Sequence, residues 1–236
     1  MNLEERIQAN WYWDIKQPIL REFLDGEEPW KKVPGITDYV RESARALNAL
    51  NPKPYGQNIH ESAVIGNDVY IGNDVTIEPN VVIDGPAVIL DGARLQPTAY
   101  LREGVWVGER TRIGTSELYH AIVMDEAFIP HQNYVGNSIV GNKAVMGANS
   151  ITSATRFDYE SQIPIKVKIE DEVYDSETHK LGAMIGDGAF IGCGLILNPG
   201  TTIGKGTVLY NMSHAGGHYD SHKMVRPGKE TERIYE

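Results

Sequence analysis

A branched or long aliphatic residue returns at every sixth position of the chain from Ile59 to Ile113. A second series, of small or β-branched residues, lies four positions after each of these, from Ala63 to Thr111. A helix would place apolar residues three to four apart, and a two-faced strand would alternate over several residues. The period of six predicts very short strands, three to each triangular coil, with the aliphatic side chains stacked along one axis. The stacked positions are Ile59, Ile65, Ile71, Ile77, Ile83, Ile89, Leu95, Leu101, Val107 and Ile113.

Residues 1–56 carry a different pattern and are predicted to form a helical cap. Apolar residues first return at every fourth position, as on one face of a helix, and Pro18 would kink this helix or divide it into two. A second helix is predicted from Thr37, as its N-cap, to Leu50.

We expect this helical cap to cover the open end of the coil stack, where strand edges would otherwise lack partners. A linker rich in proline at 51–54 would then lead into the coils. Large apolar side chains are available for the contact with the stack: Trp11, Trp13 and Trp30.

The period of six is interrupted twice within the predicted coil domain, which spans residues 57–211. At about 115–133 we expect coil strands separated by longer corners, and at 153–183 a polar insertion. Alternating apolar residues from Ile163 to Ile169 favour a short exposed hairpin arm in the second interruption. Because regular hexads form a flat and repetitive wall, the functional residues are expected on these insertions.

The last residues, 212–236, are polar and are predicted to form a tail that orders only against a partner subunit. Three of its histidines recur every four residues, which on a helix would form one metal-binding face: His214, His218 and His222. Gly216 and Gly217 disfavour such a helix, so no metal site is expected there.

Composition narrows the class of protein. A formal net charge of −10 over 236 residues argues against nucleic acid as the main partner. Cys193 is the single cysteine, which excludes an intramolecular disulfide. The sequence has no apolar stretch long enough to span a membrane and no basic-then-apolar leader, so we expect a cytoplasmic protein without a membrane partner.

The most specific segment is Pro130–Gly141. It resembles the His-x-x-Tyr-φ-Gly-Asp/Asn run in the C-terminal acetyltransferase domain of bifunctional sugar-1-phosphate nucleotidylyltransferase/acetyltransferases, most closely the archaeal-type versions. Leu101–Gly104, Gly147–Thr152 and His179–Ala183 look like other motifs of that domain. The chain therefore resembles the hexapeptide-repeat, left-handed parallel β-helix family over roughly 57–211.

The resemblance implies a left-handed winding, a homotrimer, and transfer of an acetyl group from acetyl-CoA to the amine of a hexosamine 1-phosphate. It implies His131 as the general base, and an imidazole is suited to this role because it titrates near neutral pH. Positions that line the sugar-phosphate site in the family correspond to Arg102, Asn133, Tyr134 and Lys180. Positions along the coenzyme A groove between subunits correspond to Ala148 and Cys193.

Plainer roles are available for the same residues. His131 could stay at a corner because it satisfies backbone groups, and Arg102 and Lys180 could be solvated charges beside the coils. Tyr134 could be a packing aromatic. Cys193 follows a glycine within a hexad and could be a small buried residue. The γ-class carbonic anhydrases share this fold, but the hexads here hold no pair of histidines of their kind.

Several positions depart from the family pattern. Val145 and Ala154 stand where hydrogen-bonding residues are expected, and a lysine that precedes the His segment falls on Tyr119 or His120. These changes weaken the features that select a phosphorylated amino sugar. No nucleotidyltransferase pattern precedes residue 57, so nucleotidyl transfer by this chain alone is not expected.

Two functions therefore remain open. One is a coenzyme-A-dependent acyltransferase that acts on an amino sugar or sugar phosphate in nucleotide-sugar metabolism. The alternative is a catalytically degenerate β-helix protein that binds a sugar nucleotide, or acts as a regulatory or assembly subunit of a nucleotidyltransferase.

Overall fold

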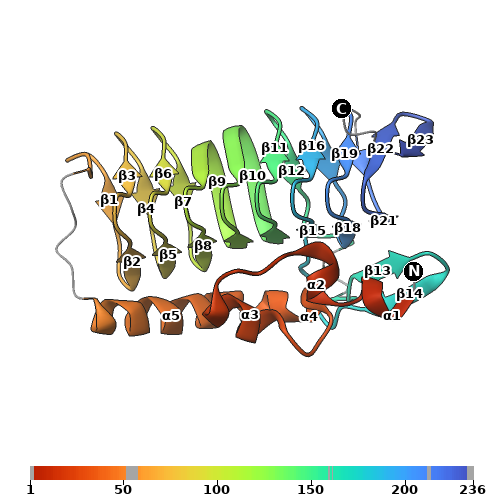
Figure 1. Cartoon of the computed structure of the whole chain (residues 1–236), viewed down its shortest axis with the longest axis horizontal. Coiled ribbons are helices and arrows are strands. Elements are labelled where there is room, and N and C mark those ends of the chain that lie inside the picture. The colour runs from red at the N-terminus through yellow and green to blue at the C-terminus, as the bar shows by residue number, and fades with distance from the viewer. Residues whose placement is uncertain (1–2, 52–57, 159, 161, 212–213, 233–236) are drawn as a thin grey trace.

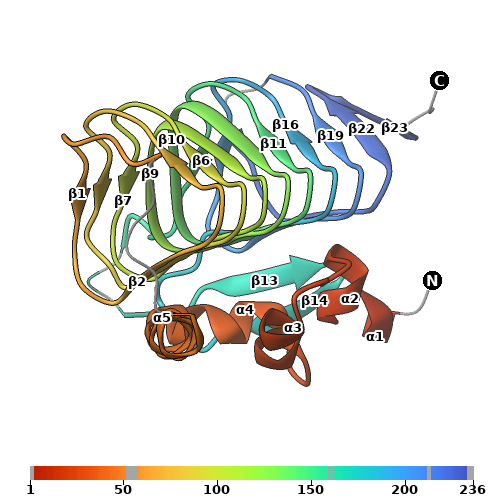
Figure 2. The ribbon, with the colours of Figure 1, turned by 60° about the vertical axis from the view of Figure 1, so that its left-hand side comes forward.

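The fold is that of a computed structural model, which describes residues 3–51, 58–158, 160, 162–211 and 214–232. The predicted linker falls mainly on residues outside these ranges. The described chain forms a left-handed parallel β-helix, along one side of which the N-terminal helices and a hairpin lie (Figures 1 and 2).

Three rows of parallel strands form the faces of the β-helix, which we call faces A, B and C. Face A contains β1 (Val64–Ile65), β4 (Val82–Ile83), β7 (Tyr100–Leu101), β12 (Ile151–Thr152), β17 (Ile196–Leu197) and β20 (His214–Ala215). Face B contains β2 (Val69–Ile71), β5 (Ala87–Ile89), β8 (Val105–Val107), β15 (Ala183–Ile185), β18 (Thr201–Ile203) and β21 (His218–Tyr219). Face C contains β3 (Thr76–Ile77), β6 (Arg94–Leu95), β11 (Val145–Met146), β16 (Phe190–Ile191), β19 (Val208–Leu209) and β22 (Lys223–Arg226). Two long strands, β9 (Arg112–Val123) and β10 (Phe128–Val140), run through all three faces.

The register confirms three hexads per coil, because Ile65 pairs with Ile83 and Ile71 with Ile89, each one coil or 18 residues further on. The predicted aliphatic positions from Ile71 to Ile113 are buried in one continuous core, with Ile59 and Ile65 partly buried at its first end. Each buried methylene contributes about 0.8 kcal/mol, so this ladder of side chains is the main source of stability along the axis.

The prediction of longer corners at 115–133 is wrong. These residues stay in the coils as parts of β9 and β10, and their corners are shorter than elsewhere. Leu101 pairs with Leu118 after 17 residues, and Val107 with Val123 after 16. The aliphatic spacing falls to five here because the strands pass round a corner without the usual extra turn residue.

The N-terminal helices lie along face B rather than over the open end of the stack, which corrects the predicted position of the helical cap (Figure 1). The helices are α1 (Leu3–Arg6), α2 (Ala9–Tyr12), α3 (Pro18–Leu24), α4 (Pro29–Lys32), the 3-10 helix η1 (Val33–Gly35) and α5 (Ile36–Leu50). The outward side chains of face B are the reason, since most are apolar and need cover: Tyr70, Val88, Trp106, Ile122, Ile139 and Met184. Trp13 and Trp30 are buried in this same contact.

Two smaller predictions in the helical region have clear outcomes. Pro18 divides the helices, since it is the first residue of α3. Thr37 is not an N-cap, because η1 leads directly into α5 and the residue before α5 is Gly35.

The insertion at 153–183 contains the predicted hairpin, formed by β13 (Lys166–Ile169) and β14 (Glu172–Asp175). The hairpin is not an exposed arm, because its side chains alternate and one set is buried against the helices. Val167 and Ile169 are fully buried there. The insertion thus completes the cover of face B at the far end of the stack.

The prediction of a tail after residue 212 is also wrong. Residues 214–226 continue the coils, and β23 (Lys229–Glu232) folds back antiparallel on β22. The three tail histidines do not share a helix, since His214 lies in β20, His218 in β21 and His222 at a corner.

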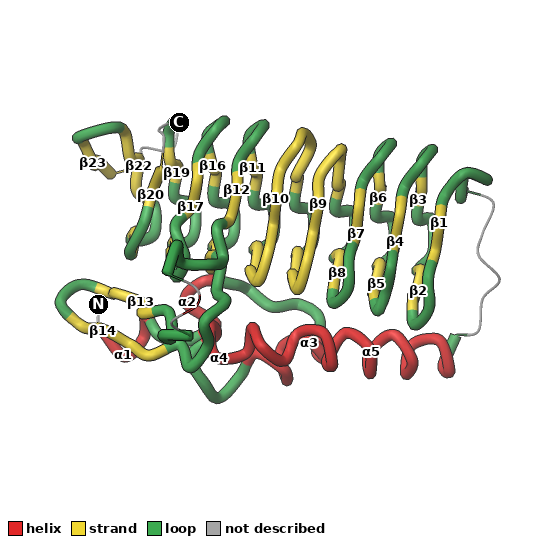
Figure 3. The backbone as a smooth tube through the Cα atoms, turned by 180° about the vertical axis from the view of Figure 1, so that it is seen from behind, coloured by secondary structure: helices red, strands yellow, loops and turns green. Residues whose placement is uncertain are grey.

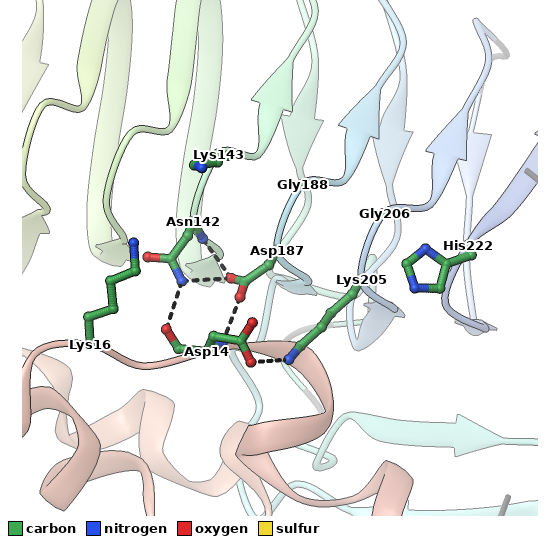
Figure 4. Close-up of a pocket in the computed structure, with 9 residues that line it drawn as sticks. All are labelled: Asp14, Lys16, Asn142, Lys143, Asp187, Gly188, Lys205, Gly206 and His222. Carbon is green, nitrogen blue, oxygen red and sulfur yellow. Dashed lines mark hydrogen bonds and ion pairs between the residues drawn. The ribbon is translucent and has the colours of Figure 1, made fainter. Parts of the chain in front are cut away.

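The corner between faces B and C ties the N-terminal segment to the coils. The Asp187 carboxylate accepts hydrogen bonds from the Asn142 backbone N–H at 2.7 Å, the Asn142 amide at 2.9 Å and the Asp14 N–H at 2.6 Å (Figure 4). The Lys205 ammonium contacts the Asp14 carboxylate at 2.6 Å, and both residues line a hollow of about 420 Å³. Burial raises the pKa of Asp187, and the three hydrogen bonds oppose that rise.

Replacing Asp187 with Ala should lower the free energy of unfolding by about 1–3 kcal/mol, because buried donors would lose their acceptor. Chemical denaturation would measure the change. Asp91→Ala is the matched control: Asp91 accepts the same kinds of bond from Asn73 at 2.8 Å on the same corner, but it is exposed and does not hold the N-terminal segment. Equal losses of unfolding free energy in both variants would contradict the role of Asp187 in holding the N-terminal segment to the coils.

A second prediction concerns His218, whose side chain is 7% exposed. It hydrogen-bonds the Thr202 hydroxyl at 2.8 Å and the Asp220 carboxylate at 3.2 Å, and the charges of Arg6 and Glu170 also act on it. Burial lowers the pKa of His218 below its ordinary value of 6.5, against the raising effect of Asp220. Between the folded and the ordinary pKa the unfolded chain binds the extra proton, so stability must fall as pH falls below 6.5.

We expect His218→Asn to reduce the loss of unfolding free energy between pH 7 and pH 5, as measured by denaturation at each pH. His60→Asn, an exposed change in the first coil, is the control. A variant with the same pH dependence as the parent would remove His218 as the cause.

Candidate functional site

The candidate site is built on the middle of face A, where β9 and β10 lie between β7 and β12 (Figure 3). The parallel register places four outward side chains in one column, one from each coil: Tyr100, Glu117, Tyr134 and Ile151. Successive residues of a strand point to opposite sides, so the neighbouring Leu101, Leu118 and Val135 enter the core. The core ladder therefore fixes the position of the column.

His131 lies at the corner that leads from face C into face A. Its carbonyl accepts a hydrogen bond from the Asn149 N–H at 3.0 Å, and the β-strand register shifts between His131 and Tyr134. The side chain is exposed, and its imidazole makes no hydrogen bond to a residue in the described ranges. The corner geometry thus holds the backbone of His131 and leaves the imidazole accessible.

The two residues expected along the coenzyme A groove lie on the same corner as His131, Ala148 one coil further along and Cys193 two coils further along. The Gly194 N–H donates to the Ala148 carbonyl at 2.8 Å, and the Cys193 N–H donates to the Asn211 amide oxygen at 3.1 Å. Cys193 is exposed, so the plainer expectation of a buried small residue is wrong. A β-carbon on Gly147 would lie 2.9 Å from the Cys193 sulfur, so the corner is packed closely there.

Arg102 follows the face A strand β7 and points to Glu117 on the next coil. Its guanidinium donates to the Glu117 carboxylate at 3.0 Å and lies over the Tyr119 ring, 4.2 Å from the ring centre. The hydrogen bond to Glu117 raises the pKa of Arg102, so the guanidinium stays charged. Arg102 is therefore part of an ion pair rather than a lone solvated charge.

Tyr134 is half-buried, and its ring lies over Gly136. A β-carbon on Gly136 would lie 2.5 Å from the Tyr134 hydroxyl oxygen, so a larger residue there would displace the ring. Burial raises the pKa of Tyr134, and the charge of Glu117 raises it further while Arg102 lowers it. The phenol is thus neutral and faces the Arg102–Glu117 pair.

Asn133 is 3% exposed and serves the corner. Its side-chain oxygen accepts from the Ser150 N–H at 2.9 Å, and its backbone N–H donates to the Ser116 hydroxyl at 3.2 Å. These bonds join three coils beside His131. The observed contacts of Asn133 are therefore with neighbouring coils.

Lys180 lies at the opposite edge of face A, where the insertion returns to the coils. The backbone there is held by Leu181 N–H to Ala154 at 3.0 Å and Gly182 N–H to Asn137 at 2.8 Å. Lys180 is exposed, and its charge acts on the half-buried His120, whose Nε2 lies 3.8 Å from the Glu103 carboxylate. Burial lowers the pKa of His120, with Lys180 and Arg102 lowering it and Glu103 raising it.

The expected residues are spread over face A and its two corners. His131, Ala148 and Cys193 lie on successive coils at the corner from face C, Tyr134 lies on face A, and Arg102 and Lys180 lie toward the corner with face B. Sequence analysis missed Glu117 and Glu103 as members of this surface, and it named Tyr119 only as a departure from the family pattern. Their signal is the 17-residue interval from Arg102 to Tyr119, which places the two side by side on adjacent coils.

The residues that depart from the family pattern lie around this surface. Val145 points outward on face C, half-buried between Phe128 and Phe190 of the neighbouring coils. Ala154 is 7% exposed and follows the face A strand β12. A hollow of about 650 Å³ opens beside it, between Ser153, Arg156 and Asn198.

Comparisons with known proteins were made for the whole chain. No family model matches the sequence. The bifunctional protein GlmU of Methanococcus vannielii is 34% identical over 204 residues, which cover 86% of this chain and 44% of that protein. The bifunctional protein GlmU of Methanocaldococcus jannaschii is 36% identical over 182 residues, covering 77% of this chain and 39% of that protein.

A third relative is the bifunctional sugar-1-phosphate nucleotidylyltransferase/acetyltransferase of Sulfurisphaera tokodaii, 34% identical over 91 residues, or 38% of this chain and 22% of that protein. The chain spans less than half the length of the three relatives. Within its described residues, none of its helices has the length and apolar character needed to cross a membrane. With its hexad coils and this similarity, the chain belongs to the hexapeptide-repeat, left-handed β-helix family and resembles part of the bifunctional sugar-1-phosphate nucleotidylyltransferase/acetyltransferases.

Proposed function

We propose that the protein is a coenzyme-A-dependent acyltransferase that moves an acetyl group from acetyl-CoA to an amino sugar or sugar phosphate in nucleotide-sugar metabolism. The observation that carries the proposal is the shared corner of His131, Ala148 and Cys193 beside the surface of Arg102 and Tyr134. Acyl transfer needs a base that both the acceptor and the thioester can reach, and the exposed imidazole of His131 lies between the corner proposed for the thioester and the polar surface proposed for the sugar.

In the proposed reaction the acceptor nitrogen attacks the carbonyl carbon of the thioester. A C–N bond forms, the C–S bond breaks, and the sulfur leaves as a thiolate. His131 takes the proton that the nitrogen loses and returns it to the thiolate, which restores the neutral imidazole. Its exposure at the corner lets both partners reach the ring.

The outward side of face A supports a homotrimer as the working form. Large apolar side chains are exposed along it, with Val64 59%, Ile151 36% and Ile196 40% exposed. Face B cannot take part in such a contact, because the helices and the hairpin already cover it. A second copy against face A would cover this apolar row and close a cleft over His131.

We expect His131→Ala to lower kcat by about 10²–10⁴-fold, the usual contribution of a general base. Thiol release from acetyl-CoA would be followed across a panel of amino sugars and their 1-phosphates. His60→Ala, in the first coil, is the matched control and should leave the rate unchanged. An active parent whose rate survives His131→Ala would remove His131 from the mechanism.

Calorimetry separates the enzyme from a degenerate binding protein. Calorimetric heat from acetyl-CoA supports the transferase. A parent chain that gives no heat with millimolar acetyl-CoA, but responds to a sugar nucleotide, would favour the binding or regulatory role.

The trimer is tested by placing charge on the exposed row. Ile151→Asp combined with Ile196→Asp should convert a trimer to monomers in light scattering after size exclusion, because buried carboxylates without partners oppose the contact. Val173→Asp is the control, since Val173 is 59% exposed on the hairpin, away from face A. A trimer that persists in the double variant would place the interface elsewhere.

A further inference from the structure

We propose that the hollow at the corner between faces B and C is a second binding site, which holds a phosphoryl group (Figure 4). The proposal goes beyond acyl transfer and does not depend on it, since His131 lies at a different corner, the one that leads from face C into face A. The phosphoryl group is either free, as in pyrophosphate, or carried by a metabolite such as a nucleoside diphosphate.

Glycine at two neighbouring coils leaves the hollow open. Four successive coils place equivalent residues at this corner: Lys143, Gly188, Gly206 and His222. All four adopt the left-handed conformation, with φ between 56° and 65°. The last three each donate a backbone N–H to a carbonyl of the preceding coil at 2.7 Å, which fixes the column. A β-carbon on Gly188 would meet no atom within 4 Å, so the space between Lys143 and His222 is free for a ligand.

The charge of this corner changes along the stack. In the coils before Asn142 its charged residues are mostly acidic: Asp74, Asp91, Glu109, Arg110, Asp125 and Glu126. In the later coils that line the hollow, Lys143 and Lys205 stand against one carboxylate, Asp187. The part of the corner that is hollowed is therefore also the part that favours an anion.

The two carboxylates that line the hollow are both engaged. Asp187 accepts three hydrogen bonds from Asn142 and Asp14, and burial raises its pKa. The Asp14 carboxylate is paired with the Lys205 ammonium at 2.6 Å. The charge of each carboxylate is thus offset at short range by the groups that hold it.

Two ammonium groups are then available to an anion, one from each side of the hollow. Lys16 is exposed and extends from the N-terminal segment toward the coils, and it has no hydrogen bond or ion pair with any residue that the structure describes (Figure 4). Its charge acts on the buried Asp125, whose pKa is raised by burial. The Lys143 side chain is 64% exposed, and its contact with Glu126 is long, at 3.9 Å. An exposed pair of this kind contributes little to stability, so a ligand can take the ammonium.

These features match a phosphoryl group. Lysine binds phosphate as a point charge, and two lysines on separate elements suit a group with more than one negative charge. The volume of about 420 Å³ is in the range usual for small-molecule sites. Because Lys16 belongs to the N-terminal segment and Lys143 to a coil, a bound phosphoryl group would join the two.

The test is calorimetry with pyrophosphate at low ionic strength, on the parent chain, Lys16→Gln and Lys143→Gln. Both lysines are exposed, so the fold should survive either change. We expect each substitution to raise the Kd for pyrophosphate at least about fivefold, because each removes one charge from the site. Pyrophosphate should also raise the Tm of the parent, and this rise should shrink in both variants.

Lys229→Gln is the matched control. It removes the same charge from an exposed lysine on β23, at the other end of β22 from His222. An equal loss of affinity in this control would show a general effect of charge and overturn the inference. So would pyrophosphate binding that is lost in Arg102→Gln but survives both hollow variants, or the absence of heat at millimolar pyrophosphate.

Uridine diphosphate is the second probe and distinguishes the two sources of the phosphoryl group. A Kd lower than that of pyrophosphate, raised by the same two variants, would identify a nucleotide as the ligand. A Kd that is no lower, but still raised by both variants, would identify the phosphoryl groups alone as what the hollow binds. A Kd for both probes that neither variant changes would overturn the inference and leave the acyltransferase proposal intact.

Discussion

The stacking of inward aliphatic side chains, coil upon coil, is the constraint on which the rest of the molecule depends. Each of these residues covers its equivalent one coil below, and the backbone of each coil donates to the next through parallel ladders. A slip of one residue would turn the core series outward, so the register is strongly specified. The outward positions are released from packing and can differ from face to face.

The three faces use this freedom in different ways. Face B presents tyrosine, valine, tryptophan, isoleucine and methionine side chains, which require the helices and the hairpin as cover. Face A mixes exposed aliphatic residues with tyrosines and the Arg102–Glu117 pair. Because the helices and the hairpin already cover face B, the exposed side chains of the coils lie on the remaining faces and corners.

The shortened coils of β9 and β10 give the surface its local chemistry. Where the interval from coil to coil falls to 17 residues, Tyr119 lies beside Arg102, and Glu117 enters the column of Tyr100 and Tyr134. The shift in register between His131 and Tyr134 belongs to the same irregularity. The polar members of the surface are thus concentrated where the repeat is least regular, as expected for repeat proteins.

The sequence by itself determined the coils, because the period of six leaves one arrangement that buries every sixth residue. Local motifs also singled out His131, Arg102 and Tyr134 as candidates, and the alternation of apolar residues predicted the hairpin. The sequence failed for the position of the helices, the course of residues 115–133 and the final coil. Only the tertiary structure decided these, and with them the pairing of Arg102 with Glu117, because each depends on which residues meet across a full coil. That meeting is set by corner lengths, which differ by one or two residues; the changed aliphatic spacing shows that the repeat is irregular there, but not which residues of adjacent coils pair.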